Sequence, residues 1–240
     1  MKKIFFSFLA LIFAAMGVNA QKTIHDPDAV KVDVKNFHAI NVSNAFNVYI
    51  SQSNDEAVAI SASEEKYRGN IKVEVENGVL KIYYDKNGFL KGLSGDKMKL
   101  KAYISFKDID KLTVSGACDV FVEGGIKANA LELNLSGASD LNGKLNVKKL
   151  DVNISGASDV KLNGTALQLS IEASGASDFK GYDLVTETCN VTASGASSIQ
   201  ITVNKELSAQ ASGASDVRYK GDGVIREIKS SGASSVSKKS

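Results

Sequence analysis

Five aspartates recur at nearly even intervals in the C-terminal half of the chain, and carboxylates in such a row could bind a cation or cap turns. They are Asp119, Asp140, Asp159, Asp178 and Asp216. If successive copies stack like the strands of a sheet, the carboxylates lie about 4.8 Å apart. Neighbouring charges then repel by roughly 1 kcal/mol in water and about 3 kcal/mol at an intermediate dielectric. Either bound Ca²⁺ or backbone N–H groups donated to each carboxylate at its own turn would offset that repulsion.

Two further copies of the same motif favour the turn over the metal. Ser198 and Ser235 stand there in place of aspartate. Serine can make a weaker form of the same turn, whereas it is a poor calcium ligand. We therefore expect the aspartates to cap turns and the protein to need no cofactor, with a calcium ladder as the alternative.

A serine followed by a glycine opens each of the seven copies of the motif. The pairs are Ser115 and Gly116, Ser136 and Gly137, Ser155 and Gly156, Ser174 and Gly175, Ser194 and Gly195, Ser212 and Gly213, and Ser231 and Gly232. A nucleophilic serine needs a base within hydrogen-bond reach, but both histidines, His25 and His38, lie in the N-terminal half. We predict a structural turn ladder, in which the glycine takes a positive φ and the following alanine tucks inward.

Other catalytic patterns are weak in this sequence. Polysaccharide lyases and hydrolases gather their acids in one cluster across a groove, whereas these carboxylates are spread out by the repeat. There is no tryptophan, the best platform for stacking on a sugar. Cys189 occupies a column of leucines, so we expect a buried thiol there, and Cys118 replaces the second serine of the motif. The two cysteines lie in different coils and different columns, so we expect no disulfide between them. These observations favour a protein that is not an enzyme.

The motif Ser-Gly-Ala-Ser-Asp determines the expected fold. It recurs every 18 to 21 residues from Ser115, and a weaker copy lies at Ser43–Asn47. An apolar-polar-apolar alternation precedes each copy and an apolar residue follows it, as in strands with one buried face. We predict a right-handed parallel β-helix with coils of about 19 residues and apolar columns inside. A sandwich of hairpins would need turns at half this spacing.

The N-terminal half carries strand patterns without a clear repeat. We expect an irregular mixed or antiparallel sheet over residues 37–110, with a hairpin at Asn77-Gly78, that covers one end of the helix. The predicted organisation is a signal peptide over 1–20, a tail over 21–36, this β region, the repeat β-helix over 111–236 and a tail over 237–240.

The first twenty residues have the features of a secretory signal. Lys2 and Lys3 precede an apolar run from Ile4 to Met16, and small residues end at Ala20. The run is too short to span a bilayer, so we expect no membrane span after cleavage. The protein should be exported to the periplasm, the cell surface or the medium. Without the leader the basic and acidic residues balance, which argues against nucleic acid as a partner.

The run of a hydrophobic residue followed by Ser-Gly-Ala-Ser-Asp resembles the DUF2807 family, also called the putative auto-transporter adhesin, head GIN domain family. The opening segment from Phe37 to Ser43 (Phe-His-Ala-Ile-Asn-Val-Ser) resembles it too, and the likeness extends to the C-terminus. Asn44 and Asn47 depart from the motif in the first copy. The resemblance implies an exported β-helical protein of unestablished biochemical role, with no catalytic residue to carry over.

We therefore predict a non-catalytic exported cell-envelope protein that adheres or assembles through long, repetitive polar faces. A cell-surface protein or a glycan would suit such a face. One alternative is a periplasmic module that binds glycan or the strand edge of a partner protein. A polysaccharide-active β-helix enzyme is a weaker alternative.

Overall fold

The computed structural model describes residues 26–85 and 98–239. The expected signal peptide over 1–20 lies outside the described residues. In the described part of the chain, a single sheet of 17 strands winds into a coil. One helix, α1 (Glu65–Arg68), interrupts the strands of the N-terminal region.

Nine short strands form the N-terminal region. They are β1 (Val30–Val32), β2 (Ala39–Asn44), β3 (Phe46–Gln52), β4 (Ala57–Ser61), β5 (Ile71–Glu76), β6 (Val79–Tyr84), β7 (Leu100–Phe106), β8 (Lys111–Gly116) and β9 (Asp119–Glu123). Eight strands follow in the regular region, the first five of them long and the last three short. They are β10 (Ile126–Leu135), β11 (Asp140–Ile154), β12 (Asp159–Ala173), β13 (Asp178–Ala193), β14 (Ser198–Ala211), β15 (Asp216–Lys220), β16 (Val224–Ser230) and β17 (Ser235–Lys238).

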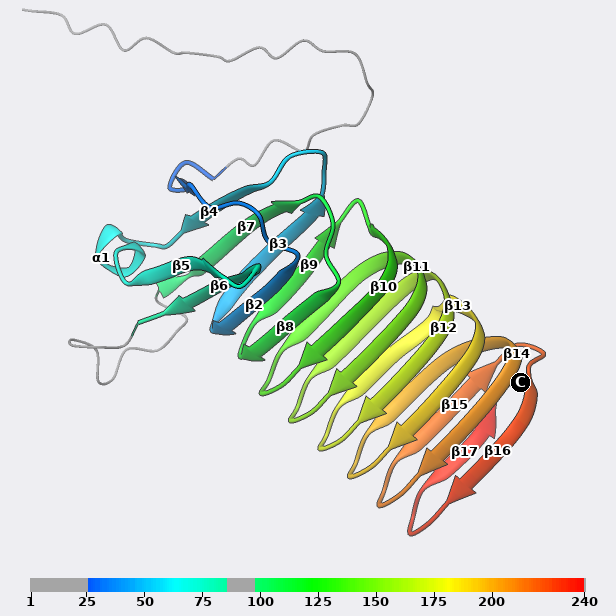
Figure 1. The fold of residues 1–240 in the computed structure, drawn as a ribbon. Coiled ribbons are helices and arrows are strands. Elements are labelled where there is room, and N and C mark those ends of the chain that lie inside the picture. The colour runs from blue at the N-terminus through cyan, green and yellow to red at the C-terminus, as the bar shows by residue number, and fades with distance from the viewer. Residues whose placement is uncertain (1–25, 86–97, 240) are drawn as a thin grey trace, which may run out of the picture.

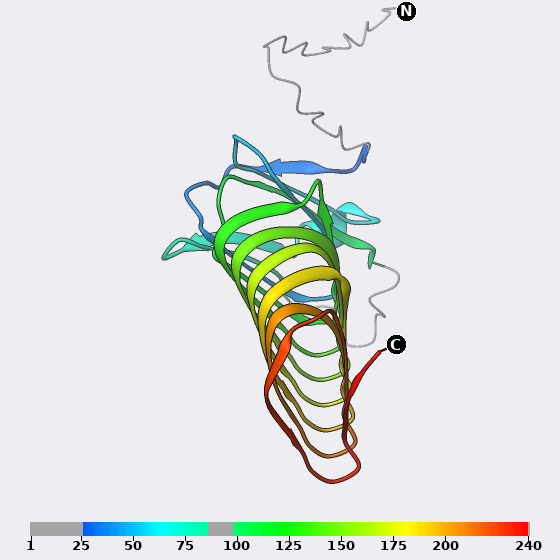
Figure 2. The ribbon, with the colours of Figure 1, turned by 90° about the vertical axis from the view of Figure 1, so that its right-hand side faces the viewer.

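The regular region is a stack of parallel coils, one coil for each copy of the motif. Each of the strands β11 to β14 begins after a tight corner, runs along one face, bends round a broad curve and returns along the opposite face (Figures 1 and 2). Successive strands pair in parallel with matching positions aligned, as in Asp140 with Asp159 and Ile154 with Ala173. The coils wind in the right-handed sense (Figures 1 and 2). The predicted parallel β-helix with coils of about 19 residues is confirmed.

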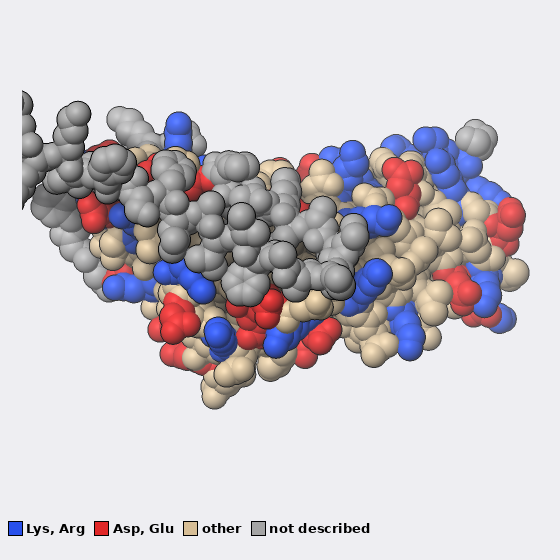
Figure 3. Space-filling model, turned by 90° about the horizontal axis from the view of Figure 1, so that it is seen from above, with Lys and Arg blue, Asp and Glu red and all other residues tan. Residues whose placement is uncertain are grey.

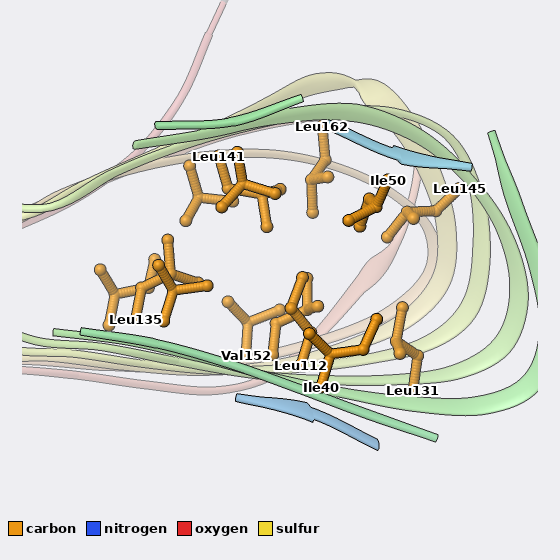
Figure 4. Close-up of a cluster of buried hydrophobic side chains, with 14 of the residues drawn as sticks. Ile40, Ile50, Leu112, Leu131, Leu135, Leu141, Leu145, Val152 and Leu162 are labelled. Atoms are coloured by element: carbon orange, nitrogen blue, oxygen red, sulfur yellow. The ribbon is translucent and has the colours of Figure 1, made fainter. Parts of the chain in front are cut away.

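Apolar side chains at every second position of the strands fill the interior of the coil. One inward column contains a residue from each of six successive coils, namely Val120, Leu141, Val160, Phe179, Ile199 and Val217, all at most 2% exposed. Figure 4 shows leucines and isoleucines from the two faces meeting between them, among them Leu135, Leu141 and Leu162. Burying one such side chain stabilises the fold by roughly 1.5–3 kcal/mol. The same alternation places every intervening polar residue outside.

The N-terminal region continues the stack and also closes it. The coil of β2 and β3 lies between the coil of β6 and β7 and the coil of β8 and β9, with parallel pairing on both sides. Antiparallel strands then cover the outer edges, with β5 on β6, β4 on β7 and β1 on β4. The β5–β6 hairpin turns at Asn77 and Gly78, which both have positive φ, as predicted. The mixed sheet over this region is also confirmed.

After β3, the chain therefore first forms the coil of β6 and β7 on one side of the β2–β3 coil. It then forms the coil of β8 and β9 on the other side. The segment between β7 and β8 crosses back over the β2–β3 coil, and a polar contact holds it in place. Nδ1 of His38 lies 3.0 Å from a carboxylate oxygen of Asp110, and the Asp110 N–H donates to the His38 carbonyl at 3.0 Å. Because stacking order and chain order differ here, the repeat is blurred in this half of the sequence.

Candidate binding surface

The motif forms the tight corner of each coil, where the backbones of successive coils approach closely. All seven motif glycines have positive φ. At Gly156 the φ is +78°, and a Cβ there would lie 2.3 Å from the Gly137 carbonyl oxygen of the preceding coil. The next residue donates its N–H to that same oxygen, with 2.7 Å between Ala157 N and Gly137 O. Only glycine fits this backbone conformation at this separation.

The alanine of the motif points outward, so the expectation that it tucks inward is wrong. Ala138 is exposed, whereas Ser139 is completely buried. Ser139 precedes the inward-facing Leu141 by two residues and therefore shares its face. The same position is buried in the neighbouring coils, where it holds Cys118, Ser158, Ser177, Ser197 and Ser215.

This buried residue caps the corner, a role that the sequence argument gave to the aspartate. The Ser139 hydroxyl donates to the Ser136 carbonyl at 3.1 Å and accepts the N–H of Cys118 at 3.4 Å. The Ser139 N–H in turn donates to the hydroxyl of Ser158 in the next coil at 3.2 Å. The bond back to the carbonyl three residues earlier recurs at Ser177, Ser197, Ser215 and Ser234. Hydroxyls at this position therefore cap the corners, and the bonds of Ser139 tie its coil to the coils on both sides.

Ser139→Ala should destabilise the protein by about 1–3 kcal/mol, because it leaves the buried Cys118 N–H and Ser136 carbonyl without this partner. Ser136→Ala is the matched control. Ser136 is only half-buried, and we expect its substitution to change the free energy of unfolding by no more than about 0.5 kcal/mol. Urea unfolding of both variants measures the difference. Equal losses would show that the buried hydroxyl has no special role.

The aspartates lie on the outside of the corner, aligned from coil to coil. Asp119, Asp140, Asp159 and Asp178 are in register. The Lys180 ammonium lies 2.7 Å from the Asp159 carboxylate and 3.5 Å from that of Asp178, so one lysine serves two coils. The hydrogen bond to Asp159 raises the pKa of Lys180. Within residues 26–85 and 98–239, no group of three or more His, Cys, Asp or Glu side chains is arranged to hold a metal ion.

Asp140 lies farther from this lysine, and the pKa of its carboxyl is raised, first by burial and then by the charges of Asp159 and Asp119. A carboxyl that holds its proton more tightly when folded stabilises the fold below its unfolded pKa, and this contribution is lost as the pH rises through the folded pKa. Asp140→Asn should therefore raise the Tm at neutral pH, and the gain should disappear as the pH falls below about 4.

The control is Asp216→Asn. The Asp216 carboxylate lies 3.5 Å from the Arg218 guanidinium and accepts a hydrogen bond from Ser235. Removing this paired charge should not raise the Tm. Thermal unfolding at several pH values compares the two variants, and a Tm for Asp140→Asn that is lowered at neutral pH would contradict the charge argument.

The face formed by the strand segments that lead into the corner is polar along its length, and we call it the polar face. Its outward positions form columns of amides, hydroxyls and carboxylates from β8 to β14. A hollow of about 350 Å³ runs across several coils there. It is lined by Thr113, Asn134, Leu135, Ser136, Asn153, Ile154, Ser155, Glu172, Ala173, Ser174, Thr192 and Ser194.

Hydrogen bonds between coils order the polar face. The Asn153 amide donates to the Asn134 amide oxygen at 2.8 Å, and Asn134 donates to Glu132 at 2.8 Å. Lys111 pairs with Glu132 at 3.0 Å. Beside the hollow lies a second one of about 340 Å³, lined by residues such as Asp151 that lie farther back along the same strands. The polar face therefore offers similar groups about every 4.8 Å along the stack.

Charges elsewhere on the surface are mixed. Figure 3 shows lysines and arginines interspersed with aspartates and glutamates over the described part of the chain, with uncharged surface between them. No field of one sign covers the coils in this view.

An aromatic stack on the opposite face went unnoticed in the sequence. The Tyr49 ring stacks on Tyr103 at 5.2 Å and on Phe121 at 5.3 Å between centroids. The three residues come from adjacent strands, β7, β3 and β9, which are not consecutive in the chain. Both faces of Tyr49 are covered by its neighbours, so this ring stabilises the stack and offers no free face to a sugar.

The two cysteines are free, buried thiols. Cys118 holds the capping position of its corner, and Cys189 lies in register with Leu169 and Leu207 inside the coil. Burial raises the pKa of both thiols. Since the thiolate is the reactive form, neither residue has the environment of a nucleophile.

Comparisons with known proteins agree with this fold. A family model described as putative auto-transporter adhesin, head GIN domain (DUF2807), matches residues 36–223. No curated protein sequence matches the chain. None of the helices in the described residues is long and apolar enough to cross a bilayer.

Solved structures share the architecture at low sequence identity. A putative adhesin from Bacteroides fragilis superposes with a TM-score of 0.81 at 22% identity, covering 88% of this chain and 96% of its own. A putative lipid binding protein from Parabacteroides distasonis gives 0.67 at 19% identity, with coverage of 90% and 98%. A putative adhesin from Parabacteroides merdae gives 0.64 at 19%, with coverage of 88% and 95%. By its family match over most of its length, the chain belongs to the DUF2807 family of head GIN domains.

Proposed function

We propose that this chain is an exported, non-catalytic protein of the cell envelope that adheres through the polar face. The observation that carries the proposal is the coil-by-coil recurrence of hydroxyl and amide groups around a hollow of about 350 Å³. The adhesin names given to its family and to structural neighbours support the same role.

The arrangement of the acidic residues supports a role without catalysis. The corner carboxylates lie in register in successive coils, at most one to a coil, instead of converging on one bond of a substrate. The two thiols are buried with raised pKa values. Apart from Glu172, the polar side chains that line the hollow are uncharged hydroxyls and amides, which donate and accept hydrogen bonds.

A ladder of equivalent groups suits a ligand that repeats along its own length. Each coil then contributes a similar weak contact, and contacts made by one extended ligand add as intramolecular events. A cell-surface glycan or an extended protein segment has this character.

Asn153→Arg tests the polar face by filling the hollow with a long charged side chain. Asn146→Arg is the matched control, because Asn146 bonds Thr165 in the next coil at 2.9 Å outside this hollow, much as Asn153 bonds Asn134. We expect Asn153→Arg to reduce binding of the purified protein to intact producer cells at least tenfold, and Asn146→Arg to leave it unchanged. Equal binding by both variants would contradict adhesion through the polar face.

Labelling of intact cells with a membrane-impermeant amine reagent tests the location. An outward adhesin should be labelled on exposed lysines such as Lys148 and Lys149. Recovery of unlabelled protein from the periplasmic fraction alone would favour the alternative of a periplasmic binding module.

A further inference from the structure

The C-terminal coil exposes residues that every other coil buries. All seven residues of β16 are exposed. Ile225 and Ile228 are 44% and 40% exposed, although they stand in register with Leu207 and Ala209, which are fully buried. The two isoleucines belong to the inward columns, but in the described residues no further coil covers them.

The two ends of the stack differ in how their edges are treated. At the N-terminal end, antiparallel strands β4 and β5 cover β7 and β6. At the C-terminal end, β16 pairs with β14 and β17 pairs with β15, and within the described residues no strand lies on their outer side. An exposed edge that also shows apolar side chains is a template for pairing with another chain.

A bulge in β16 changes which of its side chains share a face. As a result, the side chains of β16 match those of a second β16 strand that runs in the opposite direction. Leu207 pairs with Ile225 and Ser208 with Glu227, so Arg226 is an extra residue between them. Ile225 and Ile228 therefore both face inward although they are three residues apart. Arg226 reaches Glu206 and Glu227 reaches Lys229 on the outer surface.

We propose that two copies of this chain associate end to end, with β16 of one copy antiparallel to β16 of the other about a two-fold axis. Centring the axis between Arg226 and Glu227 places Ile225 opposite Ile228 of the second copy. It also places Arg226 opposite Glu227. A two-fold contact repeats each of these pairs, giving two isoleucine pairs inside and two ion pairs outside.

The geometry favours a second copy over continued stacking in one direction. The N-terminal edges of the stack are already occupied by β4 and β5, so the C-terminal coil of one copy cannot extend the parallel sheet of another there. Two C-terminal ends can meet only with antiparallel strands. Arginine carries five N–H donors, so Arg226 can keep Glu206 and also bind Glu227 of the second copy.

Sedimentation velocity from low to several hundred micromolar protein tests this contact by exchanging charges. The wild-type protein should approach twice the mass of one chain as the concentration rises. Arg226→Glu or Glu227→Arg alone creates two like-charge pairs and should weaken association at least tenfold. The double variant R226E/E227R restores opposite charges and should recover association to within a few-fold of the wild type.

Lys148→Glu, an exposed charge reversal on the middle of the stack, is the control and should leave association unchanged. Circular dichroism checks that each variant remains folded, since Arg226→Glu also removes the bond to Glu206. I225K/I228K should be monomeric throughout. A wild-type protein that stays monomeric at the highest concentration would overturn the proposal, as would singly reversed variants that dimerise normally or a double variant that fails to recover.

Discussion

Gly156→Ala is expected to destabilise the protein by about 3 kcal/mol, and two separate costs contribute. An alanine at a φ of +78° costs roughly 1–2 kcal/mol in backbone strain. Its Cβ would also lie 2.3 Å from the Gly137 carbonyl oxygen, which already accepts the Ala157 N–H. Forcing such a contact in a packed structure costs about 1–3 kcal/mol more. The Tm should fall by roughly 6–12 °C.

Gly124→Ala separates these two costs. Gly124 has a φ of +75°, almost the same as Gly156, but nothing lies within 4 Å of the Cβ position. Its substitution should therefore cost only the backbone strain, about 1–2 kcal/mol. Urea unfolding of both variants measures the difference. If the two losses were equal, the close approach of coils at the corner would have no energetic weight.

Phe179→Ala is expected to cost about 3–5 kcal/mol, because it leaves a cavity in the middle of the stack. Phe179 is fully buried and stands in register with Val160 and Ile199, which are too small to fill the space. The coils on either side are tied to their own neighbours by backbone hydrogen bonds, so they can collapse only partly into the cavity.

Phe121→Ala is the matched control for this cavity. Phe121 lies on the outer surface, is 39% exposed and stacks only on Tyr49. Losing that stacking should cost about 1 kcal/mol. Chemical denaturation compares the two variants. A loss at Phe121 as large as that at Phe179 would contradict the assignment of inside and outside.

The repeat region was predictable because its local and long-range signals coincide. The spacing of the motif gives the length of a coil, and the alternation around Leu133, Val152 and Ile171 gives the inward face. The direction of the corner residues was also within reach. Counting back by two from Leu141 places Ser139 inside and Ala138 outside, but the small size of alanine suggested the opposite.

The cap of the corner, the partners of β3 and the shared face of two isoleucines depend on contacts between segments that are distant in the sequence. The Asp140 carboxylate can cap a turn or face its neighbours, and only the stacked geometry shows that Ser139 makes the cap instead. Nothing within Phe46–Gln52 indicates that β3 pairs with both β7 and β9. Ile225 and Ile228 are three residues apart, so the two-residue alternation of a strand predicts opposite faces for them. They share the inward face because Arg226 forms a bulge between them.

The central claim is that each copy of the motif builds one coil and that the coils are interchangeable. Deleting one whole coil tests this claim most directly. Removing residues 155–173 joins Ile154 to Ser174 and preserves the motif, the inward columns and the corner. The shortened protein should retain its strand signature in circular dichroism and unfold cooperatively. Removing residues 155–163 deletes about half a coil and shifts every later residue out of register, so that variant should fail to fold. A half-coil deletion that folds as well as the whole-coil deletion would contradict the account.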